Sequence, residues 1–154
     1  AISTEGYRRL LEWMEALIEK YTDDPLHQLV EVSCAYVDFA SRDPAHFKVT
    51  FSGAIEKEKE YPAFVEISQQ TLRLVIQVVE ACQAAGVLKP GPSEAAAVSV
   101  WSAVHGLASL LIENQIPHTV LERMNAREIV LFVLDQVTLV ELRPEMFPAE
   151  NTNI

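Results

Sequence analysis

Four histidines and two cysteines are the side chains of this sequence best suited to catalysis or metal binding, yet their spacing favours neither. There is no His-x3-His pair, and neither Cys34 nor Cys82 stands beside a histidine at metal-ligand spacing. The closest carboxylate–imidazole pair, Asp43-x-x-His46, falls at an expected helix start, where an aspartate serves as an N-cap. Hydrolase elbows, phosphate-binding glycine loops and Cys-x-x-Cys motifs are absent from the sequence. We therefore expect no catalytic residue, no metal site and no cofactor.

Noncovalent binding of an apolar compound is the chemistry that the remaining residues favour. Aromatic side chains with polar groups between them suit a cavity that has an apolar wall and a few polar anchors. Trp101 and His105 are one helical turn apart, so both can face a single site. The alternative is a plain core in which His105 bonds to a neighbouring helix. The expected ligand-binding residues are Tyr36, Phe39, Phe47, Phe51, Phe64, Ser68, Trp101 and His105.

The elements that must position these residues are helices, because apolar residues recur with helical period almost throughout. Two Asp-Pro pairs, Asp24-Pro25 and Asp43-Pro44, are typical of helix starts, with aspartate as N-cap and proline as first helical residue. We expect an all-α fold of about six helices, a domain over residues 1–142 and a C-terminal tail over 143–154. The charged segment 56–60 is expected to be solvated or to cover a pocket. The expected helices span residues 4–21, 25–42, 46–51, 62–85, 93–114 and 126–141.

The last two of these helices are too apolar for ordinary surface helices, which have one apolar stripe and one polar face. The helix 93–114 has apolar residues on two opposite sides, separated by a row of small ones that includes Ser102 and Gly106. A symmetric homodimer would bury the second sides, and the two helices from each subunit would form a four-helix interface. A monomer with 93–114 as its central helix is the alternative. The expected interface residues are Ala96, Val100, Ala103, Leu107, Leu110, Leu131 and Leu134.

Charge and hydropathy exclude further classes of function. The 154 residues carry 22 acidic and 12 basic side chains, and a net charge of −10 argues against a nucleic-acid surface on this chain. Residues 95–112 have no charged side chain over 18 residues, the lower limit for crossing a membrane. Serines, a histidine and a glycine interrupt this stretch, so we expect a helix buried in a soluble protein. With no signal-peptide pattern and only two cysteines, we expect a cytoplasmic protein without membrane contact.

Two segments resemble the C-terminal domain of tetracycline-repressor-type (TetR) transcriptional regulators. Trp101 to Leu110, with its Trp-x3-His-Gly core, is similar to a signature of many such domains. Residues 35–51 resemble the family passage in which a helix is followed by xxPxxFxxxF. The order of elements over residues 6–142 also agrees with that family. The sequence departs from it in having no helix-turn-helix of its own, so we expect a fragment of a longer regulator.

This resemblance implies a homodimer whose pocket binds a small hydrophobic or aromatic effector, which releases the full-length repressor from DNA. The helix 4–21 would connect the pocket to the DNA-binding domain. Two other classes stay open: a helical dimeric interaction module without a ligand, and a small α-helical enzyme that uses a serine or histidine in the cavity.

Overall fold

The computed structural model describes residues 2–51 and 62–149, and these residues form helices and no strands. The all-α prediction is confirmed. The charged segment 56–60, expected to be solvated or to cover a pocket, lies outside the described residues. The helices are α1 (Ile2–Lys20), α2 (Pro25–Arg42), α3 (Pro44–Phe51), α5 (Pro62–Ala84), α6 (Ser93–Ile112), α7 (His118–Leu121) and α8 (Ala126–Asp135), followed by the 3-10 turn η1 (Pro144–Met146).

The two Asp-Pro pairs begin α2 and α3 as predicted. The carboxylate of Asp24 accepts a hydrogen bond from the backbone N–H of His27 at 3.1 Å, and its other oxygen contacts His27 Nδ1 at 2.7 Å. Asp43 makes the same pair of contacts to His46, and these hydrogen bonds hold the pKa of Asp43 below its usual value. Asp43 and His46 therefore form a helix start, which accounts for their spacing without a metal or a reaction.

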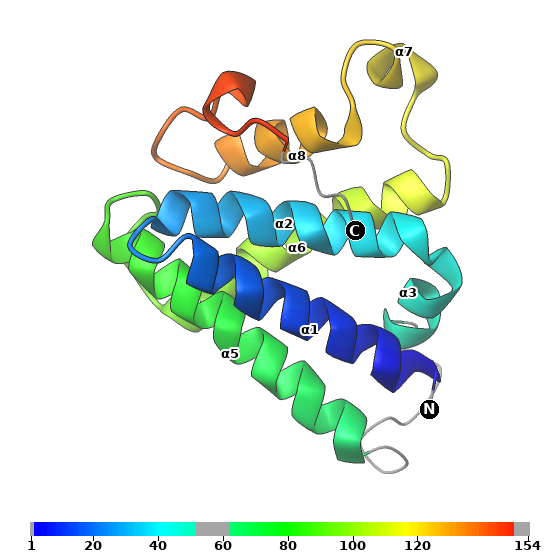
Figure 1. Ribbon diagram of the computed structural model, residues 1–154. Helices are drawn as coiled ribbons and strands as arrows, with labels where there is room; N and C mark the ends of the chain where they lie inside the picture. Colours follow the sequence, from blue (N-terminus) through cyan, green and yellow to red (C-terminus); the bar gives the residue numbers. More distant parts are fainter. Residues whose placement is uncertain (1, 52–61, 150–154) are drawn as a thin grey trace.

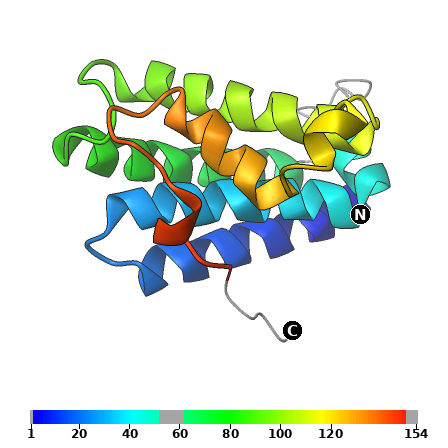
Figure 2. The same cartoon turned by 90° about the horizontal axis from the view of Figure 1, so that it is seen from above.

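α2 is the central helix of the molecule. It packs against α1, α3, α5, α6 and α8, and it crosses the middle of Figure 1 with α8 above it and α1 and α5 below. Seen from above, α8 lies over α2 and α6 (Figure 2). This arrangement places α2 against every helix that could form a site with it, since α1, α5 and α6 all contact it.

α6 is the one helix in the described part of the chain that is long and apolar enough to cross a membrane, judged by length and composition only. Core helices of soluble proteins meet the same criterion. In this fold α6 packs against α2, α5 and α8. This packing accounts for one side of α6 only, because 28% of its apolar stretch is buried within the chain, less than the expected buried helix would show.

The helix expected over residues 126–141 is much shorter than predicted. α8 ends at Asp135, and a carboxylate oxygen of Asp135 accepts a hydrogen bond from the backbone N–H of Leu142 at 2.7 Å. The N–H of Leu139 donates to the carbonyl of Val87 at 2.8 Å, which ties this segment to the end of α5. Val137, Thr138 and Val140 are β-branched and have low helix propensity, so the tertiary bonds prevail.

The structure corrects which sides of α6 and α8 are available to a partner. Four of the seven expected interface residues, Val100, Leu107, Leu131 and Leu134, are buried in the core of the chain itself. Ala96 and Ala103 are half-buried, and Leu110 is exposed. The periodicity was ambiguous because both sides of α6 are apolar. The outward side of α6 holds the small row, and the exposed large apolar residues of α6, α8 and the following turn are Val98, Trp101, Leu110, Phe132 and Leu139.

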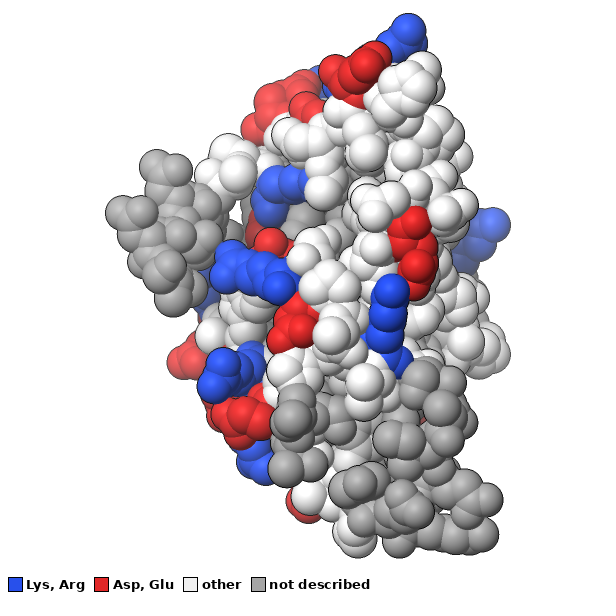
Figure 3. All heavy atoms as spheres, turned by 90° about the vertical axis from the view of Figure 1, so that its right-hand side faces the viewer, with Lys and Arg blue, Asp and Glu red and all other residues white. Residues whose placement is uncertain are grey.

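The segment after residue 142 is packed on the domain as far as it is described. Phe147 is buried and lies against the ring of His27, with 4.7 Å between ring centroids. Its carbonyl accepts two hydrogen bonds from Arg127. Figure 3 shows that basic and acidic side chains of the described residues are interspersed on the face at the right of Figure 1.

Candidate functional site

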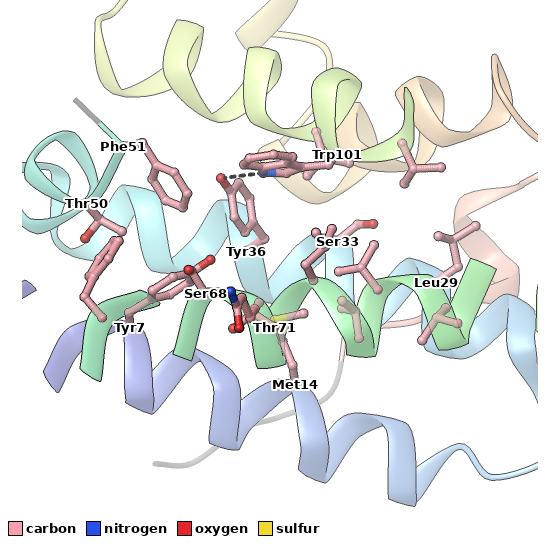
Figure 4. Close-up of a pocket in the computed structure, with 18 residues that line it drawn as sticks. Tyr7, Met14, Leu29, Ser33, Tyr36, Thr50, Phe51, Ser68, Thr71 and Trp101 are labelled. Atoms are coloured by element: carbon pink, nitrogen blue, oxygen red, sulfur yellow. Dashed lines mark hydrogen bonds between the residues drawn. The ribbon is translucent and has the colours of Figure 1, made fainter. Parts of the chain in front are cut away.

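A cavity of about 340 Å³ lies between α1, α2, α3, α5 and α6 (Figure 4). Met14 and Tyr7 reach it from α1, and Leu29 to Tyr36 reach it from α2. None of the lining side chains among the described residues carries a charge, and their polar groups are hydroxyls, one amide and the indole N–H of Trp101. The lining residues are Tyr7, Met14, Leu29, Val32, Ser33, Tyr36, Thr50, Phe51, Phe64, Ser68, Gln69, Thr71, Leu72, Val75, Val78, Val100, Trp101 and Val104.

Aromatic rings form the wall at the α3 end of the cavity. Tyr7 lies 5.7 Å from Phe64 and 5.8 Å from Phe51, measured between ring centroids. Phe51 lies 5.8 Å from Tyr36 and 6.2 Å from Trp101. These contacts connect five helices through one set of rings, so the shape of this wall depends on all of them.

Tyr36 is the centre of a hydrogen-bonded trio at the α6 side of the cavity. Its hydroxyl oxygen accepts a hydrogen bond from the indole N–H of Trp101 at 3.1 Å (Figure 4). The same hydroxyl lies 2.7 Å from Nδ1 of His105. Burial raises the pKa of Tyr36, and burial lowers the pKa of His105. Both shifts keep these two groups neutral at pH 7.

Two hydroxyls of α5 bond to the backbone of their own helix. Ser68 donates to the carbonyl of Val65 at 2.8 Å, and Thr71 donates to the carbonyl of Ile67 at 2.8 Å. Thr71 also contacts Tyr7, whose pKa burial raises to about 12. Ser33 differs: it is 5% exposed, and its hydroxyl has no hydrogen-bond partner among the described residues.

The cavity opens between α5 and α6. Gln69 and Leu72 on α5 and Trp101 on α6 line it and are also exposed at the surface. Deeper residues such as Thr71, Val78 and Val104 are buried. A compound entering here would pass the apolar side chains of Leu72 and Trp101 and the amide of Gln69.

The structure brings five of the eight expected ligand-binding residues to the cavity wall: Tyr36, Phe51, Phe64, Ser68 and Trp101. The other three, Phe39, Phe47 and His105, do not line it. His105 instead bonds to Tyr36, and its ring stacks on Phe47 with 5.2 Å between centroids. Whether any of them binds a ligand stays a prediction.

Sequence reasoning missed the contribution of α1. Tyr7 and Met14 line the cavity, and neither was among the expected ligand-binding residues. They are seven residues apart and therefore on one side of the helix. The aromatic Tyr7 was the available signal in the sequence. Its contact with the polar Thr71 of α5 could not be predicted, because no sequence pattern relates α1 to α5.

The two cysteines are free, and neither is activated. Burial raises the pKa of both Cys34 and Cys82 to about 12. Both remain thiols at neutral pH, and a thiol is a poor nucleophile. Among the described residues there is also no group of three His, Cys, Asp or Glu side chains placed to hold a metal ion.

A second hollow of about 420 Å³ lies between α1, α2 and α8. Its charged groups are already paired: Glu31 bonds to Arg127 with both carboxylate oxygens, and Asp38 pairs with Arg42 at 2.7 Å. The first cavity is therefore the better candidate for a ligand, since its wall costs little to desolvate.

Comparisons with known proteins place the fold. Residues 29–132, more than half of the chain, match the family described as "Tetracyclin repressor-like, C-terminal domain". A comparison with curated proteins gives no match. Among solved structures, a protein of unknown function from Rhodococcus sp. RHA1 is similar with a TM-score of 0.71 and 22% identity, covering 88% of this chain and 68% of that one. At this identity the likeness concerns the fold alone.

Proposed function

We propose, from the premise that the chain belongs to the tetracyclin repressor-like C-terminal domain family, that it is the effector-binding and dimerisation domain of a transcriptional repressor. A small hydrophobic or aromatic compound in the cavity would release the full-length protein from DNA. The protein would act in the cytoplasm as a regulator, without an enzymatic reaction or a cofactor.

The observation that carries this proposal is the cavity whose wall, as far as the chain is described, has no charged side chain. An anionic or cationic ligand would lose its hydration there without gaining a counter-charge. An uncharged aromatic compound would instead bury its surface against Phe51, Trp101 and Val75. A volume of about 340 Å³ is within the range of sites for small organic molecules.

The coupling between effector and DNA would pass through α1. Tyr7 and Met14 of this helix line the cavity, so a bound compound would contact α1 and affect its position. If effector and DNA favour different positions of α1, each weakens the binding of the other by the same factor.

The helices α6 and α8 pack against each other within the chain. The homodimer would use the sides of these two helices that face outward. Val98 and Leu110 of α6 are 49% and 47% exposed, and Phe132 of α8 is 58% exposed. Between Val98 and Leu110 lies the row of small residues Ser99, Ser102, Gly106 and Ser109. A Cβ added at Gly106 would meet nothing within 4 Å. Short side chains let two helices approach closely.

An enzyme is the second class considered, and the site gives it less support. A serine nucleophile needs a base within hydrogen-bond reach. Ser33 has no such partner among the described residues, and His105 bonds to Tyr36 instead. An interaction module without a ligand would need a solid core at the place where the cavity lies.

A cavity-filling substitution tests the proposed ligand site. With 2-naphthol in large excess over its Kd, the wild-type melting temperature should rise by several degrees, because a bound ligand stabilises the folded state by about 2.7 kcal/mol at 100 times Kd. Ser68→Trp, on the cavity wall, should abolish this rise. Gln77→Trp, on the exposed side of the same helix, should keep it. An equal rise in both variants would place the ligand elsewhere, and no rise in any protein would contradict the proposal.

A further inference from the structure

The hydroxyls of the cavity differ in whether they still have a proton to donate. The phenol of Tyr36 has one proton and accepts from Trp101, whose indole N–H is a donor only. Its remaining close partner is Nδ1 of His105 at 2.7 Å, a separation typical of an O–H donor. If Nδ1 carried the proton, the phenol oxygen would accept from both Trp101 and His105, and its own proton would have no acceptor in the hydrogen bonds of the described residues, which is costly for a buried donor.

Tyr36 therefore donates to His105 and offers the cavity only a lone pair. The lowered pKa of His105 supports this arrangement, because a neutral ring is needed to accept. The hydroxyl protons of Ser68 and Thr71 are likewise already used, since each residue donates to a backbone carbonyl of α5. Three lining hydroxyls thus accept hydrogen bonds from a ligand more readily than they donate to one.

Ser33 does not oppose this preference. Its hydroxyl has no partner among the described residues, so it can turn to donate or to accept. Ser33 therefore serves ligands that donate a hydrogen bond and ligands that accept one equally. The discrimination between them falls on Tyr36, one turn further along α2.

We propose that the cavity prefers uncharged ligands that donate a hydrogen bond, such as phenols and other hydroxyl or N–H compounds, over ligands of equal shape that only accept. His105 determines this specificity by taking the proton of Tyr36. It is a positioning residue, because it touches Tyr36 and not the ligand. The inference rests on the proposed function and names the chemical class of its effector.

Matched probes test the preference. Calorimetric titration of the wild-type chain should give 2-naphthol a Kd roughly five- to tenfold lower than that of 2-methoxynaphthalene, which corresponds to about one neutral hydrogen bond. Equal affinities would overturn the inference and leave the cavity as a ligand site. Failure of both probes to bind would overturn the proposed function together with it.

Two variants separate the direction of the hydrogen bond from the shape of the site. Tyr36→Phe removes the lone pair, so 2-naphthol should lose its advantage while the affinity for 2-methoxynaphthalene stays the same. His105→Phe keeps an aromatic ring against Phe47 and frees the proton of Tyr36. In this variant 2-methoxynaphthalene should gain affinity, and the ratio between the probes should approach one.

The control on the same helix is Ser102→Ala, which lies outside the cavity and removes only a bond to the carbonyl of Val98. Both affinities should stay at their wild-type values. If His105→Phe weakens both probes by the same factor and keeps their ratio, His105 acts on structure alone and the inference fails. Melting curves of each variant confirm that it is folded before titration.

Discussion

Tyr36 and His105 connect the proposed ligand site to the stability of the fold. Burial lowers the pKa of His105 below its ordinary value of about 6.5, so the unfolded chain takes up a proton first as the pH falls. The stability contributed by neutral His105 is present above about pH 6.5 and is lost on acidification below it. The melting temperature of the wild type should therefore fall between about pH 7.5 and 5.5.

His105→Phe removes this titration, so its melting temperature should fall less over the same range. The comparison with the wild type cancels the titration of the other histidines, which both proteins contain. An identical pH dependence in the two proteins would show that His105 is not buried as a neutral ring.

Arg127 and Glu31 form the most buried ion pair among the described residues. Their side chains are 22% and 10% exposed, and two guanidinium nitrogens contact the two carboxylate oxygens. Arg127→Met leaves the charge of Glu31 buried without a partner, so the free energy of unfolding in urea should fall by about 3 kcal/mol. Arg9→Met removes the exposed partner of Glu5 and should change it by less than about 0.5 kcal/mol.

The double variant Glu31→Leu with Arg127→Met distinguishes a buried charge from lost packing. It should be more stable than Arg127→Met alone, because no uncompensated charge remains. A double variant as unstable as the single one would mean that the aliphatic part of Arg127 and its bonds to Phe147 matter more than the ion pair.

The side chains of the site were predictable only where one helix carries the information. Phe51, Phe64 and Trp101 were found because aromatic residues at helical spacing stand out in a sequence. Whether an inward residue meets a cavity or a neighbouring ring depends on other helices, as His105 shows by bonding to Tyr36, 69 positions away.

Among the helices, α8 gives the sharpest test of which surface a partner would cover. Phe132 is 58% exposed, and Leu134 is fully buried. Phe132→Asp should give a folded monomer of about 17.2 kDa by sedimentation, where the wild type gives about twice that mass. Leu134→Asp should give unfolded or insoluble protein, because it buries a charge in the core.

A wild-type chain that sediments as a monomer at micromolar concentration would contradict the dimer. A Phe132→Asp variant that remains dimeric would place the interface on another surface. Circular dichroism of each variant shows whether a change of mass comes with a loss of helix.

The helix starts were predictable because local chemistry decides them. Asp24 and Asp43 each bond to the first turn that follows them, within three residues. The end of α8 was not predictable. The hydrogen bonds from Leu142 to Asp135 and from Leu139 to Val87 join segments that no local pattern relates. The same limit applied to α6, whose inward side is set by α2, α5 and α8 and not by its own sequence.

The molecule as a whole carries a net charge of −10, which sets its behaviour toward nucleic acid. We predict that residues 1–154 alone have no salt-dependent affinity for DNA, because binding to phosphates requires clustered Lys and Arg. Electrophoretic mobility assays over a range of salt concentrations, with an unrelated DNA-binding protein as positive control, would show this. Tight sequence-specific binding by these residues alone would contradict the charge argument.

A crystal structure of the chain grown with 2-naphthol would show whether the cavity binds an uncharged aromatic compound and how Tyr36 contacts it. We predict that the compound lies in the cavity that opens between α5 and α6. Its rings should lie against Phe51 and Trp101, and its hydroxyl should lie within hydrogen-bond distance of the Tyr36 oxygen. The side chain of His105 should still contact Tyr36 through Nδ1. A compound bound only in the hollow between α1, α2 and α8, or a cavity that stays free of it at saturating concentration, would contradict the account.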